Sequence, residues 1–479
     1  MEKTETATTL EESLKALFHS RFGEKVEELA ALRSDGSSRR YHRIRSAKRT
    51  VIGAHGPDAK ENAAFLGFSK QFKSMGLPVP EIYAEDAPAG IYLEEDFGET
   101  NLFEHLSSRR TSAGFSDDTV AIYEAAVRML PQFQITAGRK LDYSICYPRA
   151  RFDRQSMMWD LNHFKYYFLT LSKTHFDESA LEEDFNRLAD YLCEAEQDYF
   201  LYRDFQSRNI MVQHGSPRFI DYQGGRRGAL QYDIASLLFD AKADMPYSLR
   251  ERLLSGYMDA VGGLIKLDRE KFLGHYHGYV FIRIMQALGT YGLRGFYERK
   301  VHFLKSIPYA MCNLEYLLRT AELPVKLPAL WEVFRALIGS SYLRQFTDAK
   351  LRLTVRIQSF SYRAGVPADA KGHGGGYVFD CRSLPNPGRH ERYADLTGKD
   401  PEVIDFLDRE QAVHGWLDKV FGIIDQSVEN YQGRNFTDLL VAFGCTGGQH
   451  RSVYCAERLA DHLRSKFDVD VEVAHLARR

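Results

Sequence analysis

An aspartate and an asparagine five residues apart begin a predicted strand–turn–strand segment near the middle of the chain. Asp204 and Asn209 precede the apolar triplet 210–212, and Asp221 ends the next apolar run. Phosphoryl transfer needs an aspartate that accepts the proton of the attacking hydroxyl, and oxygen ligands that hold Mg²⁺ on a nucleoside triphosphate. A hairpin returns the chain to its start, so we expect Asn209 and Asp221 to meet. A single aspartate would indicate only a solvated loop, but the combined spacing favours a catalytic one.

The residues around this segment predict a small sheet followed by a helical region. Turn residues separate the short apolar runs, and the longer runs have helical periodicity. Helices are predicted at 9–22 and 59–75, and strands at 26–32, 41–45, 49–54, 81–84 and 90–94. From 101 to 195, and again from 225 to 322, the pattern is mainly helical.

The composition excludes several classes of protein. Hydrophobic residues make up 44% and charged residues 27% of 479 residues, which argues against long disorder. The net charge of −2 disfavours binding of nucleic acid through bulk positive charge. No apolar run is long enough to span a bilayer, and the first residues lack the apolar core of a secretory signal. Six scattered cysteines favour reduced thiols, so we expect a cytoplasmic protein.

Several stretches of residues 25–320 together resemble one family, the aminoglycoside phosphotransferase (APH) superfamily. Within it, the resemblance is to bacterial kinases that phosphorylate N-acetylmuramate and N-acetylglucosamine at the anomeric hydroxyl. The stretches are 34–41, 93–98, 204–209, 220–221, 232–237 and 286–291. The resemblance implies an α+β, bilobal protein-kinase-like fold, with a small sheet lobe and a helical lobe.

The resemblance also implies roles for individual residues, with ATP and Mg²⁺ as cofactors. Asp204 would be the catalytic base, and Asn209 and Asp221 would be the Mg²⁺ ligands. The loop over the phosphates would consist of Asp35, Gly36, Ser37 and Ser38. The hinge beside adenine would contain Glu94 and Asp96.

The sequence departs from this family pattern in the third strand, where residues 50–54 contain no lysine to pair with the α- and β-phosphates. Lys48, Lys60 and Arg43 are alternatives, and Glu61 is the candidate partner. An inactive nucleotide-binding domain is therefore a further alternative.

Two other positions near the catalytic loop also need an explanation. Tyr202 replaces the usual histidine, which we expect to alter the support of the catalytic loop more than its chemistry. Asp233 either supports that loop or caps the helix that follows it.

The last third of the chain predicts a second fold. Two prolines within residues 323–328 indicate a break between units, and a helix is predicted at 329–341. A Gly-rich loop is expected at 371–376. Further strands are predicted at 352–359, 377–381 and 438–443, and further helices at 401–431 and 450–467.

A Gly-rich loop between the last of these strands and the last helix forms a candidate anion site. Backbone N–H groups and a helix N-terminus favour an anion there, and Arg451 would add a charged fork. Binding of a phosphorylated ligand, a purely structural turn and cysteine phosphatase chemistry all remain open. The candidate residues are Cys445, Thr446, Gly447, Gly448, His450, Arg451 and Ser452.

Five blocks between residues 351 and 473 resemble the C-terminal domain of RapZ-type RNase adapter proteins. The blocks are 358–362, 365–367, 379–387, 397–400 and 444–453. The resemblance implies binding of glucosamine-6-phosphate at an anion pocket that matches Thr446, Gly447, His450 and Arg451, with Arg382 as an addition. RNA is the family's other partner, but the balanced charge of this region and its lack of a long basic tail give RNA weak support.

These patterns predict a kinase N-lobe at 1–97, a kinase C-lobe at 98–322, a linker at 323–350 and a sugar-phosphate-binding α/β domain at 351–479. We expect a phosphotransferase that acts on a hydroxyl of a sugar or amino sugar, with no membrane partner. A pseudokinase that senses a sugar phosphate and contacts RNA or protein is the alternative. The segment 143–154 is a candidate wall of the acceptor pocket, as is the segment 292–300.

Overall fold

The computed structural model of the chain describes residues 2–32, 39–110, 114–346, 353–367, 376–433, 436 and 438–476. The chain forms two compact units. The first consists of residues 1–165, 178–289 and 322–327, and the second of residues 166–177, 290–321 and 328–479. The segment with Asp204 belongs to the first unit, and the loop with Cys445 belongs to the second.

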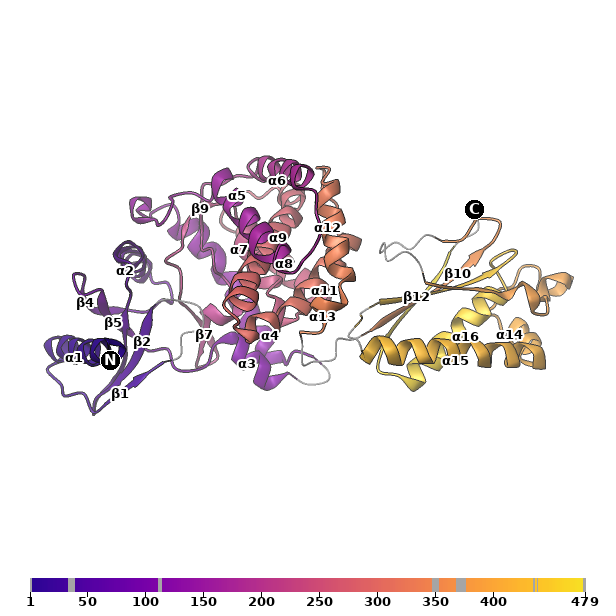
Figure 1. The fold of residues 1–479 in the computed structure, drawn as a ribbon, viewed down its shortest axis with the longest axis horizontal. Coiled ribbons are helices and arrows are strands. Elements are labelled where there is room, and N and C mark those ends of the chain that lie inside the picture. The colour runs from indigo at the N-terminus through magenta and orange to yellow at the C-terminus, as the bar shows by residue number, and fades with distance from the viewer. Residues whose placement is uncertain are drawn as a thin grey trace. The chain divides into compact units, whose positions relative to one another are not determined.

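A five-stranded antiparallel sheet forms the N-terminal part of the first unit (Figure 1). Helix α2 (Ala59–Ser74) is inserted between its third and fourth strands, so the predicted five strands and inserted helix are confirmed. Helix α1 (Glu2–Phe22) begins at residue 2, earlier than the predicted residue 9. In sheet order the strands are β1 (Glu28–Ala31), β2 (Arg40–Arg45), β3 (Thr50–His55), β5 (Ile91–Glu95) and β4 (Ile82–Asp86).

Alternation along these strands gives the sheet two different faces. One face packs on α1, where Leu14 and Phe18 are fully buried against apolar residues of β2, β3 and β5. The other face carries polar groups in rows that cross the strands. The register places Tyr41, Ala54 and Tyr92 in one row, and Arg43, Ile52 and Glu94 in the next.

The rest of the first unit is mainly helical. A capping box formed by Asn101 and Glu104 starts helix α3, and two small two-stranded sheets interrupt the helices. One pairs β6 (Tyr199–Leu201) with β9 (Arg226–Gly228), and the other is the hairpin of β7 (Ile210–Gln213) and β8 (Ser216–Phe219). The helices are α3 (Leu102–Arg109), α4 (Asp117–Pro131), α5 (Arg154–His163), α6 (Glu178–Leu192), α7 (Gln231–Leu238), α8 (Tyr247–Gly262) and α9 (Arg269–Tyr291), whose last two residues lie in the second unit.

The second unit contains a four-stranded parallel sheet, as an α/β domain requires (Figure 1). Its order is β11 (Tyr377–Asp380), β12 (Asp438–Cys445), β10 (Thr354–Ser361) and β13 (Asp470–His475). Helix α16 (Arg451–Lys466) packs on β10, β12 and β13. The remaining helices are α10 (Val301–Leu304), α11 (Ile307–Thr320), α12 (Pro328–Gly339), α13 (Ser341–Arg344), α14 (Pro401–Asp408) and α15 (Gln411–Gly433).

Two features of this unit go beyond the prediction. The long helical stretch predicted at 401–431 consists of two helices, because α14 ends at Asp408 and α15 begins at Gln411. Strand β13 was not predicted, because its residues alternate between exposed and half-buried at the sheet edge and form no apolar run. Most of the predicted Gly-rich loop at 371–376 lies outside the described residues. In the parts of the chain that the structure describes, no helix is long and apolar enough to cross a membrane.

Candidate functional site

The hairpin formed by β7 and β8 brings Asn209 and Asp221 together beside Asp204. The side-chain Nδ2 of Asn209 donates to Oδ2 of Asp221 at 2.9 Å and to the backbone oxygen of Asp204 at 2.9 Å. Gln223 Nε2 donates to the other carboxylate oxygen of Asp221 at 2.7 Å. The Asn209 amide is thus fixed through its nitrogen, so its oxygen could serve as a metal ligand. The predicted residues 35–38 lie outside the described residues.

Asp221 occupies an unusual backbone and electrostatic position. Its φ of +70° lies in the left-handed region, which turns the chain sharply after β8. Burial raises the pKa of Asp221, and the nearby charge of Asp204 raises it further. Two carboxylates this close favour a cation between or beside them.

The donor set near Asp221 fits Mg²⁺ better than a metal that needs several protein ligands. No group of three or more His, Cys, Asp or Glu suited to a metal occurs among the described residues. Mg²⁺ commonly takes one or two protein oxygens and completes its octahedron with phosphate and water. Asn209 and Asp221 can supply those protein oxygens.

Asp233 holds the backbone of the catalytic loop. Its carboxylate accepts the N–H of Tyr202 at 2.8 Å and that of Arg203 at 3.0 Å, as well as the Nε2 of Gln134 at 2.9 Å. Leu230, not Asp233, is the N-cap residue of α7. Of the two alternatives for Asp233, the structure therefore shows support of the loop. Burial raises the pKa of Asp233 to about 7, although these hydrogen bonds oppose the shift.

Tyr202 and Arg203 fix the same loop through their side chains. The Tyr202 hydroxyl donates to the backbone oxygen of Ile220 at 2.6 Å, which ties the loop to the residue before Asp221. Arg203, with φ at +83°, binds both carboxylate oxygens of Asp160 at 2.7 Å. Tyr202 therefore supports the loop through a different donor from the usual histidine.

A buried arginine lies beside Glu61, the expected partner of a phosphate-binding cation. The Nη2 of Arg39 lies 3.6 Å from Oε1 of Glu61 on α2, and Arg39 is only 2% exposed. Its charge also lowers the pKa values of Asp221 and Glu94 against the effect of their burial. Of the alternatives from the sequence, Lys48 and Lys60 are exposed.

The third alternative, Arg43, is engaged elsewhere. Its guanidinium binds both oxygens of Asp96, at 2.7 and 3.1 Å, and Oε1 of Glu99 at 2.5 Å. Glu61 was the expected partner, but Arg39 was missed. No strand pattern marked it, because Arg39 precedes β2, which begins at Arg40.

The two predicted hinge residues differ in their surroundings. The Asp96 carboxylate is held by Arg43 and by the backbone N–H of Gly98 at 2.8 Å. Glu94 is buried in the sheet, and its Oε2 has no hydrogen-bond partner among the described residues. Burial raises the pKa of Glu94 to about 8 despite the attraction of Arg39.

The predicted anion loop in the second unit follows β12. The Cys445 thiol lies 3.1 Å from the Ser452 hydroxyl. Burial opposes ionisation of Cys445, but the Ser452 hydroxyl and the backbone N–H groups of Ser452, Gly448 and Gln449 lower its pKa overall. Gly448 has φ at +66°, and a Cβ there would lie 2.8 Å from the backbone nitrogen of Ser361. A side chain at position 448 is therefore excluded.

The charged residues of this loop do not all face an anion. Arg451 is buried, and its Nη1 donates to the backbone oxygens of Arg382 at 2.9 Å and Leu384 at 3.0 Å. Nη1 thus satisfies two carbonyl groups, whereas the buried Nε has no hydrogen-bond partner among the described residues. His450 Nε2 lies 2.8 Å from the Tyr393 oxygen. Thr446 is exposed beside Gly447, around which space is open.

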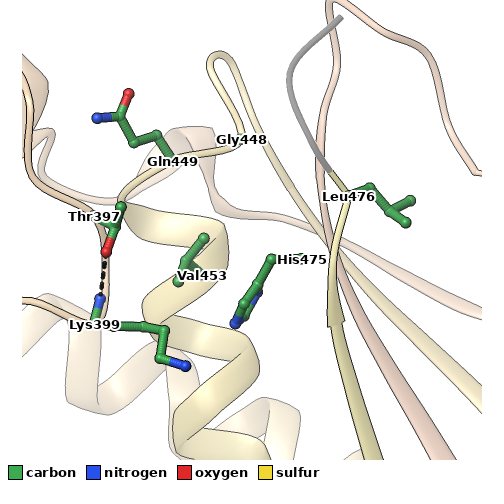
Figure 2. A pocket seen from close by; sticks show the side chains of 7 residues that line it. All are labelled: Thr397, Lys399, Gly448, Gln449, Val453, His475 and Leu476. Atoms are coloured by element: carbon green, nitrogen blue, oxygen red, sulfur yellow. Dashed lines mark hydrogen bonds between the residues drawn. The ribbon is translucent and has the colours of Figure 1, made fainter.

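A pocket of about 320 Å³ adjoins the loop on another side (Figure 2). The side chains of Lys399, Val453 and His475 are directed toward one space, whereas that of Gln449 points away. Oε1 of Glu457 lies 3.3 Å from Lys399 Nζ and 2.9 Å from His475 Nε2. The sequence had included Lys399 only within a resembling block and gave no signal for His475. The lining is Thr397, Lys399, Gly448, Gln449, Val453, His475 and Leu476.

Two family models match the chain in the two regions just described. The model of the phosphotransferase enzyme family (APH) matches residues 28–273, a little more than half of the chain. The model of the RapZ C-terminal domain matches residues 353–478. The chain belongs to the phosphotransferase enzyme family. Its kinase-like α+β fold and separate RapZ C-terminal domain confirm the predicted fold class and both resemblances.

Relatives of this phosphotransferase-family chain cover its parts unequally. A nucleotide-binding protein of Ralstonia nicotianae is 40% identical over 29% of this chain and 45% of its own length. An RNase adapter protein RapZ of Yersinia pseudotuberculosis is 43% identical over 24% of this chain and 38% of its own length. The chain thus spans less than half the length of these curated relatives. The choline kinase LicA of Streptococcus pneumoniae, a solved structure, is 14% identical with a TM-score of 0.42, over 64% of this chain and 99% of its own.

Glu94→Gln is predicted to remove a pH-dependent part of the stability. The folded state holds a proton up to about pH 8, whereas the unfolded state loses it near the ordinary pKa of 4.5. This contribution is complete below pH 4.5 and falls as the pH rises to 8, by roughly 1.4 kcal/mol per pH unit. Urea unfolding should therefore show Glu94→Gln gaining stability relative to the native chain from pH 5 to pH 8. An equal change with the exposed control Glu85→Gln would contradict this assignment.

Proposed function

We propose that the chain is an ATP- and Mg²⁺-dependent kinase that phosphorylates a hydroxyl of a sugar or amino sugar. The observation that carries the proposal is the joined set of Asp204, Asn209 and Asp221, braced by Asp233. Mg²⁺, held by Asn209 and Asp221, would neutralise charge on the transferred phosphoryl group.

Each residue of the set has a distinct task in this proposal. Asp204 orients the acceptor hydroxyl and accepts its proton as the oxygen attacks the γ-phosphorus. Asp233 fixes the backbone on which Asp204 is mounted. The main cost of the reaction is alignment of two substrates, so a rigid loop contributes directly to the rate.

Arg39 takes the place of the strand lysine in this proposal. Its guanidinium, held by Glu61, would bind the α- and β-phosphates from the sheet side. Asp35, Gly36, Ser37 and Ser38 would cover the phosphates, and Glu94 and Asp96 would lie near the adenine. Since Arg43 binds Asp96, the hinge segment keeps one position relative to β2.

Asp204→Asn is predicted to lower ADP formation by at least about 100-fold, because the amide cannot accept the hydroxyl proton. The measurement is ADP release with ATP, Mg²⁺ and a panel of neutral and acidic amino sugars. The exposed control Asp117→Asn should retain the native rate. ATP binding without turnover on any sugar would instead favour a regulatory pseudokinase that senses a sugar phosphate and contacts RNA or protein.

Arg39→Ala is predicted to reduce kcat/KM for ATP by about 10- to 100-fold, the effect of losing charge-assisted hydrogen bonds to phosphate. Arg39→Lys should recover part of the loss, because it keeps the charge but not the fork. The neighbouring exposed Arg40→Ala is the matched control. Steady-state kinetics at varied ATP would contradict this role for Arg39 if both alanine variants behaved alike.

For the RapZ C-terminal domain we propose binding of a phosphorylated sugar at the pocket beside the Cys445–Ser452 loop. Lys399 and His475 share one carboxylate oxygen of Glu457, so a phosphate could replace Glu457 as their counterion. Cysteine phosphatase chemistry has less support, because Cys445 is buried and Arg451 donates to backbone carbonyls.

Lys399→Ala is predicted to weaken binding of glucosamine-6-phosphate by about 10-fold or more, because one of the two cations is lost. Glu457→Gln should strengthen binding, because it removes the competing carboxylate. Calorimetric titration of the full chain measures both. Equal affinities for the native chain, Lys399→Ala and the exposed control Lys419→Ala would place the ligand elsewhere.

A further inference from the structure

Arg226 is a buried cation immediately beside the catalytic loop. It begins β9 and pairs with Leu201 at the end of β6, one residue before Tyr202 starts the loop. The side chain is only 7% exposed. A charged group at this depth needs a partner, since transfer of an uncompensated charge from water is costly.

Three other buried or nearly buried arginines of the first unit have carboxylate partners. Arg39 pairs with Glu61, Arg43 with Asp96, and Arg203 with Asp160. Arg226 forms no ion pair among the described residues. Its side chain donates from Nε to the backbone oxygen of Gly224 at 2.9 Å. In the part of the chain that the structure describes, neither terminal nitrogen of this guanidinium has an acceptor.

The charges around Arg226 do not compensate this burial. Burial and the positive charge of Arg203 together lower the pKa of Arg226 to about 10. Asp160 and Asp204 oppose the shift without cancelling it. Asp160 is already bound on both oxygens by Arg203. The charged groups near Arg226 therefore do not balance its positive charge, and one further negative charge would.

The charge of Asp204 acts on both Arg226 and Asp221. It raises the pKa of Arg226, as do Asp160 and Tyr232. It also raises the pKa of Asp221. Arg226 is therefore close enough to the predicted catalytic aspartate to interact with its charge.

The wall next to Arg226 is the segment that the sequence suggested for acceptor binding. Arg227 N donates to the Ala150 oxygen at 2.9 Å, and Phe152 N donates to the Arg227 oxygen at 2.7 Å. The Arg227 guanidinium lies 4.0 Å from the centre of the Tyr143 ring. Residues 150–152 thus hydrogen-bond to β9 at Arg227, the residue next to Arg226.

We propose that Arg226 binds an anionic group of the acceptor, so that this kinase prefers hydroxyl compounds that carry a carboxylate or a phosphate. The inference rests on the proposed kinase function. The acceptor's anion supplies the missing counterion of the guanidinium, and the two terminal nitrogens bind it as a planar pair. Binding at Arg226 positions the acceptor so that its hydroxyl reaches Asp204.

The test compares matched neutral and acidic acceptors. Glucose with glucuronate probes a carboxylate, and glucosamine with glucosamine-6-phosphate probes a phosphate. For the native chain, kcat/KM should favour the acidic member of at least one pair. Arg226→Gln should reduce that preference by about 10- to 100-fold, and Arg226→Lys should retain part of it. The surface variant Arg187→Gln is the control and should keep the native preference.

Several outcomes would overturn the inference. Equal losses with neutral and acidic acceptors would mean that Arg226 acts on the transferred phosphoryl group or on the fold. A preference of the native chain for the neutral members of both pairs would also overturn the inference. ADP binding and thermal unfolding check that Arg226→Gln is folded. If it is not, the acid-to-neutral ratio of Arg226→Lys decides, and a native ratio in that variant contradicts a planar pair.

Failure of the kinase proposal would be recognised separately. If no acceptor is turned over, calorimetry with the same acids in the presence of ADP and Mg²⁺ still tests the site. Binding by the native chain that is lost in Arg226→Gln supports the anion site although the kinase proposal fails. Absence of binding of every acid overturns the inference itself.

Discussion

The site in the first unit depends on the hydrogen bonds that the Asp233 carboxylate accepts from two backbone N–H groups. It fixes Tyr202 and Arg203, and therefore the position of Asp204. The Tyr202 hydroxyl then ties this loop to Ile220, next to Asp221, and the Asn209 amide joins Asp204 to Asp221. A fully buried carboxylate is costly unless several donors satisfy it, and here one side-chain and two backbone donors do so.

Charge is distributed on both sides of this loop. Arg39 lies on the sheet side near Asp221, whereas Arg226 lies on the side of β9. Both are buried, yet only Arg39 has a carboxylate, Glu61, within ion-pair distance. The difference suggests that the two cations meet different anions, one on the nucleotide and one on the acceptor. The C-terminal domain also has cations that could bind a ligand anion. There Lys399 and His475 share one carboxylate oxygen at a pocket that could admit an anion.

The parts that the sequence predicted are those governed by local spacing. A hairpin of fixed length necessarily joins Asn209 to Asp221, and period-two alternation indicated the five strands. Arg39 was missed because its role depends on Glu61, which is distant in sequence. Arg451 has the spacing of an anion-binding arginine, but two carbonyl groups from 382–384 accept hydrogen bonds from its Nη1. No local pattern reports such tertiary competition. The break between α14 and α15, and the polar edge strand β13, likewise depend on packing.

The measurement that tests the central claim most directly is identification of the phosphorylated product. The native chain would be incubated with ATP, Mg²⁺ and the acceptor panel, and the acceptors analysed by mass spectrometry alongside ADP. The account predicts one phosphoryl group on an acceptor, formed in equal amount with ADP and only when both ATP and Mg²⁺ are present. ATP bound but not consumed, or consumed without a phosphorylated acceptor, would contradict it.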